Sequence, residues 1–267
     1  MDAIKAATNR FLNADPVTHH PLQGGDLSKV SALTLSNGRL CVAKTGPLVA
    51  VEARMLKALR QAGAPTPRVL GQAGQVLLLE HLHEAAATES GWASLGASLH
   101  ALHQTHGPSF GWHEDYGFGP LAIRNTPQAD WPAFWAENRL LPTIADLPTS
   151  LRRRVETLCK HLPEILPARP PAALLHGDLW AGNVLFSGDS AHLIDPACTF
   201  GDAEVDLAML HLFATPPAAF HAAYGPLLPG WETRRAAYQL WPALVHVRLF
   251  GAGYHGLVDT CLSRLGF

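Results

Sequence analysis

The chain has 267 residues, of which 48% are hydrophobic and 16% are charged, and its formal net charge at pH 7 is −2. A chain of this length and composition can bury a substantial core, as one large domain or as two lobes, which excludes an intrinsically disordered protein. The nearly balanced charge gives no reason to expect nucleic acid or a membrane surface as a partner, and we expect neither.

The cysteines and the N-terminus indicate the compartment. Four widely spaced cysteines form no Cys-x-x-Cys pair: Cys41, Cys159, Cys198 and Cys261. This usage is typical of reduced, mostly buried thiols rather than of a disulfide framework. The N-terminus lacks the apolar region of a secretion signal, and no apolar run approaches the roughly 18 residues of a membrane span. We therefore expect a soluble, cytoplasmic protein.

The N-terminal third is predicted to form a helix and a small antiparallel sheet. Residues 2–13 have a weak helical period. Strands are expected over residues 29–35, 39–44, 68–70 and 76–79. The first two strands are separated by Asn37-Gly38, a dipeptide that favours the tight two-residue turn of a hairpin.

This region carries side chains typical of a nucleotide-binding clamp. Gly24 and Gly25 lie in a loop before the first strand, where glycine lets backbone N–H groups approach phosphate oxygens. Lys44 ends Cys-Val-Ala-Lys, which resembles the kinase strand Val-Ala-x-Lys, whose Lys contacts the α- and β-phosphates. Glu52 opens a predicted helix over 49–62 and is placed to pair with Lys44, as the corresponding kinase Glu does.

The predicted hinge follows the last of these strands. Glu80 to Leu82 end the apolar run 76–79, in the position where the backbone of a kinase binds adenine. Because main-chain groups make that contact, side-chain identity carries little information there. We place the boundary here, with a nucleotide-binding N-lobe over 1–82 and a C-lobe with the catalytic loop and acceptor site over 83–267.

The second part of the chain is predicted to be mainly helical. Helices are expected over residues 93–106, 138–144, 149–162 and 234–249. The last should kink or split at Pro242, because proline has no N–H to donate. His100, His103 and His106 lie on the first helix, but only two can share one face and no carboxylate joins them. We expect packing or capping roles for them rather than a zinc site.

Residues 174–206 contain the densest group of reactive side chains. Two apolar runs bracket a polar loop with His176, Asp178 and Asn183, and a third short strand leads to Asp195. The Asp-x4-Asn spacing matches the kinase catalytic loop, in which Asp accepts the proton of the substrate hydroxyl and Asn holds Mg²⁺. Asp195, in Asp-Pro-Ala rather than Asp-Phe-Gly, occupies the position of the second metal-binding Asp.

Phosphoryl transfer requires these residue types. The triphosphate of ATP is densely charged, and Mg²⁺ prefers the oxygen ligands that Asp and Asn supply. A carboxylate within hydrogen-bond reach must orient the attacking hydroxyl. We therefore predict ATP and Mg²⁺ as cofactors, Asp178 as base, Asn183 and Asp195 as metal ligands, and His176 as the residue that holds the loop's geometry. A polar hairpin loop that contains these residues by chance is the alternative.

The amino-acid sequence of this segment resembles that of one kinase family. His-Gly-Asp-Leu-Trp-Ala-Gly-Asn, Ile-Asp-Pro-Ala and Gly-Asp-Ala-Glu-Val-Asp-Leu-Ala-Met are similar to the fructosamine kinase (ketosamine-3-kinase) family. That family belongs to the aminoglycoside-phosphotransferase-like branch of the protein-kinase-like fold. The resemblance implies an α+β bilobal fold, with a small antiparallel-sheet N-lobe plus helix and a larger, mainly α-helical C-lobe. It also implies ATP-dependent phosphorylation of a sugar hydroxyl on a free or protein-bound ketosamine.

The resemblance also suggests roles for nearby residues. It implies that Asp206 braces the catalytic loop through hydrogen bonds. Trp180, close to the base in the sequence, would form one side of the sugar-binding site. Asp202 and Glu204 would face a cationic substrate amine, or simply provide the acidic first turn that a helix dipole favours. The aromatic residues of 131–135 would either stack on the sugar or fill the core.

Two alternatives remain open at this stage. Aminoglycoside, choline and homoserine kinases share the catalytic residues of His-Gly-Asp and the later Asn and Asp. The Leu-Trp-Ala-Gly sequence between the first Asp and the Asn argues against these three classes. A non-catalytic nucleotide-binding module is disfavoured because every catalytic residue is present. We expect a monomer. The sequence leaves open which ketosamine sugar is used and which hydroxyl is phosphorylated.

Overall fold

A five-stranded antiparallel sheet forms the N-terminal part of the computed structural model, which describes residues 2–22 and 28–267. Gly24 and Gly25, predicted to approach phosphate, lie outside the described residues. The strands lie in the order β1-β2-β3-β5-β4. Their bounds are Pro16–Pro21 (β1), Lys29–Leu35 (β2), Leu40–Thr45 (β3), Val69–Ala73 (β4) and Val76–Glu80 (β5). Two helices accompany the sheet, α1 (Asp2–Leu12) and α2 (Val49–Gln61).

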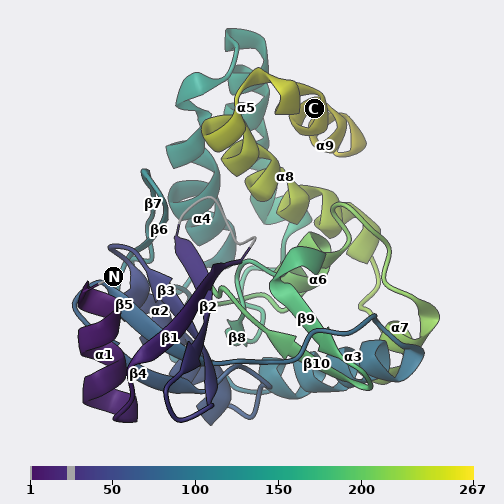
Figure 1. Ribbon diagram of the computed structural model, residues 1–267. Coiled ribbons are helices and arrows are strands. Elements are labelled where there is room, and N and C mark those ends of the chain that lie inside the picture. The colour runs from purple at the N-terminus through teal and green to yellow at the C-terminus, as the bar shows by residue number, and fades with distance from the viewer. Residues whose placement is uncertain (1, 23–27) are drawn as a thin grey trace.

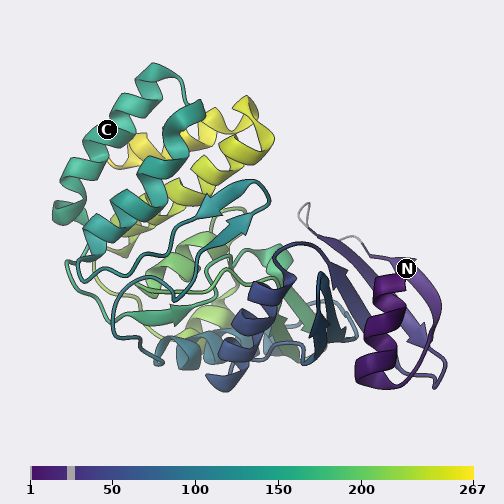
Figure 2. The ribbon, with the colours of Figure 1, turned by 90° about the vertical axis from the view of Figure 1, so that its left-hand side faces the viewer.

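The two helices cover opposite faces of the sheet. Because side chains alternate along a strand, Val76 and Leu78 of β5 join the cluster under α1, whereas Leu77 and Leu79 join the cluster under α2. The uninterrupted apolar run of β5 is thus explained by burial on both faces. Figure 2 shows α1 on the outer side and α2 between the sheet and the rest of the molecule.

The remaining chain is mainly helical, in agreement with the predicted α+β arrangement (Figure 1). Its α-helices are α3 (Glu89–His103), α4 (Trp131–Trp135), α5 (Thr149–Ile165), α6 (Glu204–Leu210), α7 (Ala218–Tyr224), α8 (Trp231–Phe250) and α9 (His255–Arg264). A π-helix (Ala136–Leu140) follows α4, and short 3₁₀ helices span Leu141–Asp146, Ala181–Asn183 and Ala252–Tyr254. Trp131, Phe134 and Trp135 are buried, so the aromatic segment fills the core.

Three small antiparallel ribbons complete this part. They pair β6 (Tyr116–Phe118) with β7 (Leu121–Ile123), β8 (Ala173–Leu175) with β11 (Thr199–Gly201), and β9 (Val184–Ser187) with β10 (Ser190–Leu193). The segment 176–183 follows β8 directly, and 194–198 joins β10 to β11. Both segments of the predicted catalytic region are therefore anchored at each end by paired strands.

Two helices differ from their predicted bounds for identifiable reasons. α3 begins four residues before the predicted start, because the Thr88 hydroxyl caps it by accepting a hydrogen bond from the Gly91 N–H at 2.9 Å. α8 runs unbroken through Pro242. Trp241 and Leu244, which lie next to Pro242 on the same helix, are buried in the core. Their packing stabilises the helix by more than the loss of the one backbone hydrogen bond that proline cannot donate.

Within residues 2–22 and 28–267, the helices include none that combines the length and the apolar character needed to cross a membrane.

The close contact of α3 with α7 yields a stability prediction. A Cβ added at Gly96 would lie 2.4 Å from the Phe220 carbonyl oxygen, so the helices would have to separate. We expect Gly96→Ala to lower the free energy of unfolding by about 1–3 kcal/mol, the usual range for overpacking. Urea denaturation measures this. Gly253→Ala is the matched control, since its Cβ would meet open space. Equal stability of the two variants would contradict the close packing.

Candidate active site

An ion triad joins the sheet, α2 and the segment after β10, with two buried members, Lys44 and Glu52, and a partly exposed one, Asp195. Lys44 Nζ lies 2.9 Å from Glu52 Oε1 and 2.8 Å from Asp195 Oδ1. Burial alone would lower the pKa of Lys44, but the carboxylates of Glu52 and Asp195 raise it above its usual value, so the ammonium stays charged. Burial raises the pKa of Glu52 to about 6, against the opposing effect of Lys44. The predicted pairing of Lys44 with Glu52 is therefore present, with Asp195 as a third member.

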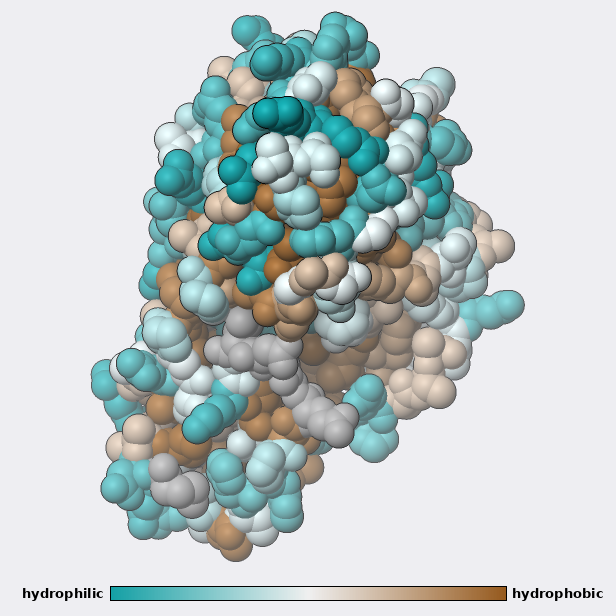
Figure 3. Space-filling model, turned by 90° about the horizontal axis from the view of Figure 1, so that it is seen from above, coloured by the Kyte–Doolittle hydropathy of each residue, from teal (hydrophilic) through white to brown (hydrophobic). Residues whose placement is uncertain are grey.

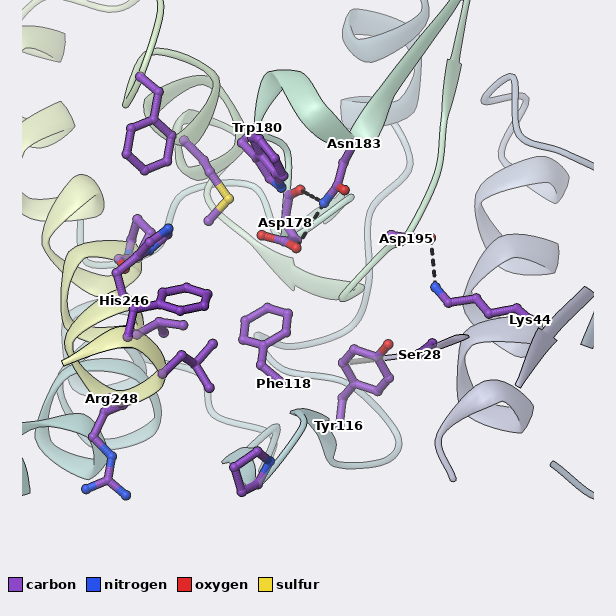
Figure 4. A pocket seen from close by; sticks show the side chains of 17 residues that line it. Ser28, Lys44, Tyr116, Phe118, Asp178, Trp180, Asn183, Asp195, His246 and Arg248 are labelled. Atoms are coloured by element: carbon purple, nitrogen blue, oxygen red, sulfur yellow. Dashed lines mark hydrogen bonds and ion pairs between the residues drawn. The ribbon is translucent and has the colours of Figure 1, made fainter. Parts of the chain in front are cut away.

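Asp178 and Asn183 face each other across the catalytic loop (Figure 4). Asn183 Nδ2 donates to Asp178 Oδ2 at 2.9 Å and to the Asp178 carbonyl oxygen at 2.7 Å. Burial raises the pKa of the Asp178 carboxyl to about 7, partly offset by the Asn183 hydrogen bond and reinforced by the charges of Asp195 and Asp206. Asp178 is thus a carboxyl group that titrates near neutral pH.

Asp206 stabilises the start of this loop through hydrogen bonds. Its two carboxylate oxygens accept hydrogen bonds from the backbone N–H groups of His176 at 2.7 Å and Gly177 at 2.9 Å. Gly177 has a φ of 80°, and a Cβ there would lie 2.0 Å from the Ala197 carbonyl oxygen. The loop can follow this path only with glycine at 177. His103 of α3 contacts the Asp206 carboxylate at 3.3 Å, a packing role of the kind expected for it.

His176 links the loop to the segment that carries Asp195. Its Nδ1 accepts from the Asp178 N–H at 3.3 Å, and its Nε2 donates to the Ile194 carbonyl oxygen at 2.9 Å. Burial lowers the pKa of His176, which keeps the imidazole neutral and suits this one-donor, one-acceptor arrangement. The next residue in the second segment, Asp195, has a φ of 55°, in the left-handed region that a non-glycine residue seldom adopts.

A cavity of about 420 Å³ connects these groups. At one end lie Lys44, Asp178, Asn183 and Asp195. Tyr116 also lies at this end, beside Ser28 (Figure 4). The other end is mostly apolar and is lined by Phe118, Met209, Phe213, Val245, Leu249 and Phe250. Trp180 lies between the two ends and is 43% exposed. Seen from above, hydrophobic residues gather in a hollow near the middle of the visible face (Figure 3).

Two predicted substrate contacts need correction. The Glu204 carboxylate accepts two hydrogen bonds from Arg234 of α8, at 2.6 and 2.7 Å. The Asp202 carboxylate accepts from the Tyr238 hydroxyl at 2.7 Å and from the Glu204 N–H at 3.0 Å. Both carboxylates are buried and neither lines the cavity, so they hold α6 against α8 instead of facing a substrate amine. Their partners lie about 30 residues further along the chain, where no local pattern connects them.

The predicted hinge residues lie away from the cavity lining. The Glu80 side chain is 3.1 Å from Arg68 Nη2, and Leu82 lies in the segment between β5 and α3. Their proposed contact with adenine uses the backbone and stays a prediction.

The structure adds two elements to the site that the sequence analysis did not place there. The β6–β7 hairpin contributes Tyr116, Phe118 and Pro120 to the cavity, and α8 contributes a row that includes His246 and Arg248. A bidentate ion pair links Arg54 of α2 to Glu114, which lies just before the hairpin, with distances of 2.7 and 2.5 Å. It connects the hairpin to the N-terminal part of the chain. In the sequence, the aromatic residues within 116–118 were the feature that could have indicated this part of the site. A three-residue strand, however, is too short to show the alternation of apolar and polar residues that identifies a strand.

Comparisons with known proteins identify the family. A family model for fructosamine kinase matches residues 3–265. The chain belongs to the fructosamine kinase family. The probable ketoamine kinase of Thermus thermophilus is 37% identical over 254 residues, covering 91% of this chain and 92% of that protein. The crystal structure of a candidate fructosamine-3-kinase from Thermobifida fusca superposes with a TM-score of 0.92 at 32% identity, covering 99% of each chain.

The predicted family and the predicted kinase-like fold are therefore confirmed, and the chain is a phosphotransferase with an alcohol acceptor. A more distant likeness, to amicoumacin kinase solved with AMP-PNP and Ca²⁺, has 14% identity and a TM-score of 0.60. It covers 94% of this chain and 88% of that one, and it shows that the fold extends over nearly the whole length.

The corrected role of Glu204 can be tested by Glu204→Gln. Losing the charge that binds Arg234 should lower the free energy of unfolding by about 1.5–3 kcal/mol, the range for hydrogen bonds to charged groups. The KM for every acceptor should stay at the wild-type value. Urea denaturation and steady-state kinetics measure the two effects, and Glu232→Gln at an exposed position of α8 is the control. A raised KM with unchanged stability would restore the substrate role.

Proposed function

We propose that the protein is an ATP- and Mg²⁺-dependent kinase that phosphorylates a sugar hydroxyl of a ketosamine, with Asp178 as the base. The observation that carries this proposal is the position of Asp178 in one continuous cavity. On one side lie a buried ammonium and oxygen ligands suited to phosphate and metal, and on the other side lies an apolar space for an acceptor.

The nucleotide end has the chemistry that a Mg²⁺-bound triphosphate requires. Lys44 is held in place by Glu52 and Asp195 and would contact the phosphates. Because Asn183 Nδ2 donates to Asp178, its amide oxygen is left to serve as a metal ligand together with the Asp195 carboxylate. When bound, Mg²⁺ neutralises the charge of the phosphates during transfer. Oxygen donors of this kind fit a hard cation.

Asp178 has the properties of a base for hydroxyl activation. Its carboxylate accepts one hydrogen bond from Asn183 and lines the cavity, where an acceptor hydroxyl would reach it. Its pKa of about 7 lies near neutral pH, which suits a group that must accept a proton and release it again. His176 and Asp206 contact the loop's backbone rather than the cavity, so they act by holding Asp178 in position.

The acceptor end favours a ketosamine over an aminoglycoside. Among the described residues that line the cavity, the carboxylates are Asp178 and Asp195, and both lie at the phosphate end. A polycationic aminoglycoside would have to leave water without an anionic partner in the apolar half, which is unfavourable. A ketosamine carries a single amine beside its sugar, and Trp180 offers a flat face against which the sugar would pack.

The proposal predicts which acceptors are turned over. ADP release should be seen with the ribulose and fructose adducts of Nα-acetyl-lysine, and neither kanamycin nor choline should support it. Asp178→Asn should reduce kcat on the ketosamine by about 10²- to 10⁴-fold, as expected for the loss of a general base. Thermal unfolding of that variant checks that the fold is retained. Turnover of kanamycin or choline in preference to both ketosamines would overturn the assigned substrate.

The raised pKa of Asp178 predicts a pH dependence. The carboxyl is protonated below its pKa of about 7 and then cannot accept the hydroxyl proton. Activity should therefore be about half-maximal near pH 7, approach its full value about one pH unit higher, and fall on acidification, with kcat/KM declining about tenfold per pH unit once the group is protonated. Initial rates across that range measure the profile. The residual activity of Asp178→Asn should lack this limb, and a flat wild-type profile would argue against Asp178 as the base.

A further inference from the structure

We infer that the apolar half of the cavity binds the amine carrier of the ketosamine, and that the enzyme selects carriers that are hydrophobic and lack a second positive charge. Here the carrier means the group attached to the sugar through the amine nitrogen. This inference rests on the proposed function and adds the chemical class of the acceptor to it.

Large apolar side chains are concentrated around this half of the cavity. Phe118 comes from the β6–β7 hairpin, Met209 from α6, and Val245 and Leu249 from α8. These residues come from three elements that are far apart in the sequence, and they form one continuous wall. Burying the apolar surface of a ligand against such a wall is favourable in proportion to the area removed from water.

Two phenyl rings at this wall remain open to solvent. Phe213 is 54% exposed and Phe250 is 49% exposed, and both line the cavity. The His246 ring lies between them, with centroid separations of 5.3 Å and 5.4 Å. His246 itself is fixed by a 2.7 Å hydrogen bond from its Nδ1 to the Pro242 carbonyl oxygen. The rings are therefore held in place before the ligand arrives, and a carrier would cover surface that is now exposed.

This half of the cavity offers a cationic carrier no carboxylate among the described lining residues. Arg248 of α8 lies at its edge, and Figure 4 shows the guanidinium pointing away from the other lining side chains. Its Nη1 is paired with the Asp146 carboxylate at 2.8 Å, and Asp146 does not line the cavity. A second ammonium on the carrier would therefore leave water without an anionic partner in the described lining.

The position of the wall relative to the base fits this assignment. With a sugar hydroxyl at Asp178 and the phosphates beside Lys44, the rest of the acceptor must extend away from the phosphate end. Trp180, Phe213 and Phe250 line the same cavity and so offer a surface to the rest of the acceptor. A cavity volume of about 420 Å³ is within the range that binds small ligands.

A matched set of acceptors tests the inference. One ketose is attached to methylamine, to pentylamine, or to one end of 1,5-diaminopentane, and kcat/KM is measured for each adduct. The pentylamine adduct should exceed the methylamine adduct by on the order of tenfold or more, because its additional methylenes become buried. The diaminopentane adduct has the same length but a terminal ammonium, and its kcat/KM should fall to the methylamine level or below.

Variants connect the preference to the wall. Phe213→Ala and Phe250→Ala should each lower the ratio of pentylamine to methylamine kcat/KM several-fold. Leu228→Ala removes another exposed apolar side chain, 69% accessible and outside the cavity lining, and should leave the ratio unchanged. Equal kcat/KM for the three adducts, or a preference for the diaminopentane adduct, would overturn the inference while leaving the proposed kinase intact. Absence of turnover with every adduct would overturn the proposed function and this inference together.

Discussion

One buried ammonium holds the phosphate end of the molecule together. Lys44 lies between the carboxylates of Glu52 and Asp195, which belong to parts of the chain separated by more than 140 residues. Burial raises the pKa of Glu52 to about 6, and the negative charge of Asp195 adds to this rise while Lys44 opposes it. In the proposed function, the positive charge of a bound Mg²⁺ would offset the excess negative charge of the two carboxylates.

A second set of contacts separates the task of positioning from the task of reacting. Asp206 and His176 contact the catalytic loop through its backbone, and neither lines the cavity. His176 is kept neutral by burial, while the Asp206 carboxylate is satisfied by two N–H donors. Asp206 also acts on Asp178 through its charge, which helps to raise the pKa of the Asp178 carboxyl. In the proposed reaction Asp178 would exchange the proton, while His176 and Asp206 hold the backbone on which it lies.

The sequence predicted those parts of the fold whose causes are local. The strand over 29–35 was placed correctly because Asn37 and Gly38 lie where the hairpin reverses, although the loop spans the three residues 36–38 between Leu35 and Arg39 instead of the predicted two. The pairing of Lys44 with Glu52 followed from the spacing between strand and helix. Asp202 and Glu204 were misassigned because Tyr238 and Arg234, on another helix, decide where those carboxylates point. The sequence of a first helical turn rich in acidic residues is the same whether the carboxylates face solvent, a substrate or a distant arginine.

The two halves of the cavity differ in how they tolerate change. At the phosphate end each side chain is joined to another functional residue, as Lys44 is to Asp195, so a substitution there disturbs several groups at once. At the acceptor end Phe213 and Phe250 are about half exposed, and replacing them removes little buried core. Surface positions of this kind usually change stability by small amounts. The side chains proposed to bind the acceptor can therefore be replaced without breaking the contact between Lys44 and Asp195, because different parts of the chain carry the two sets.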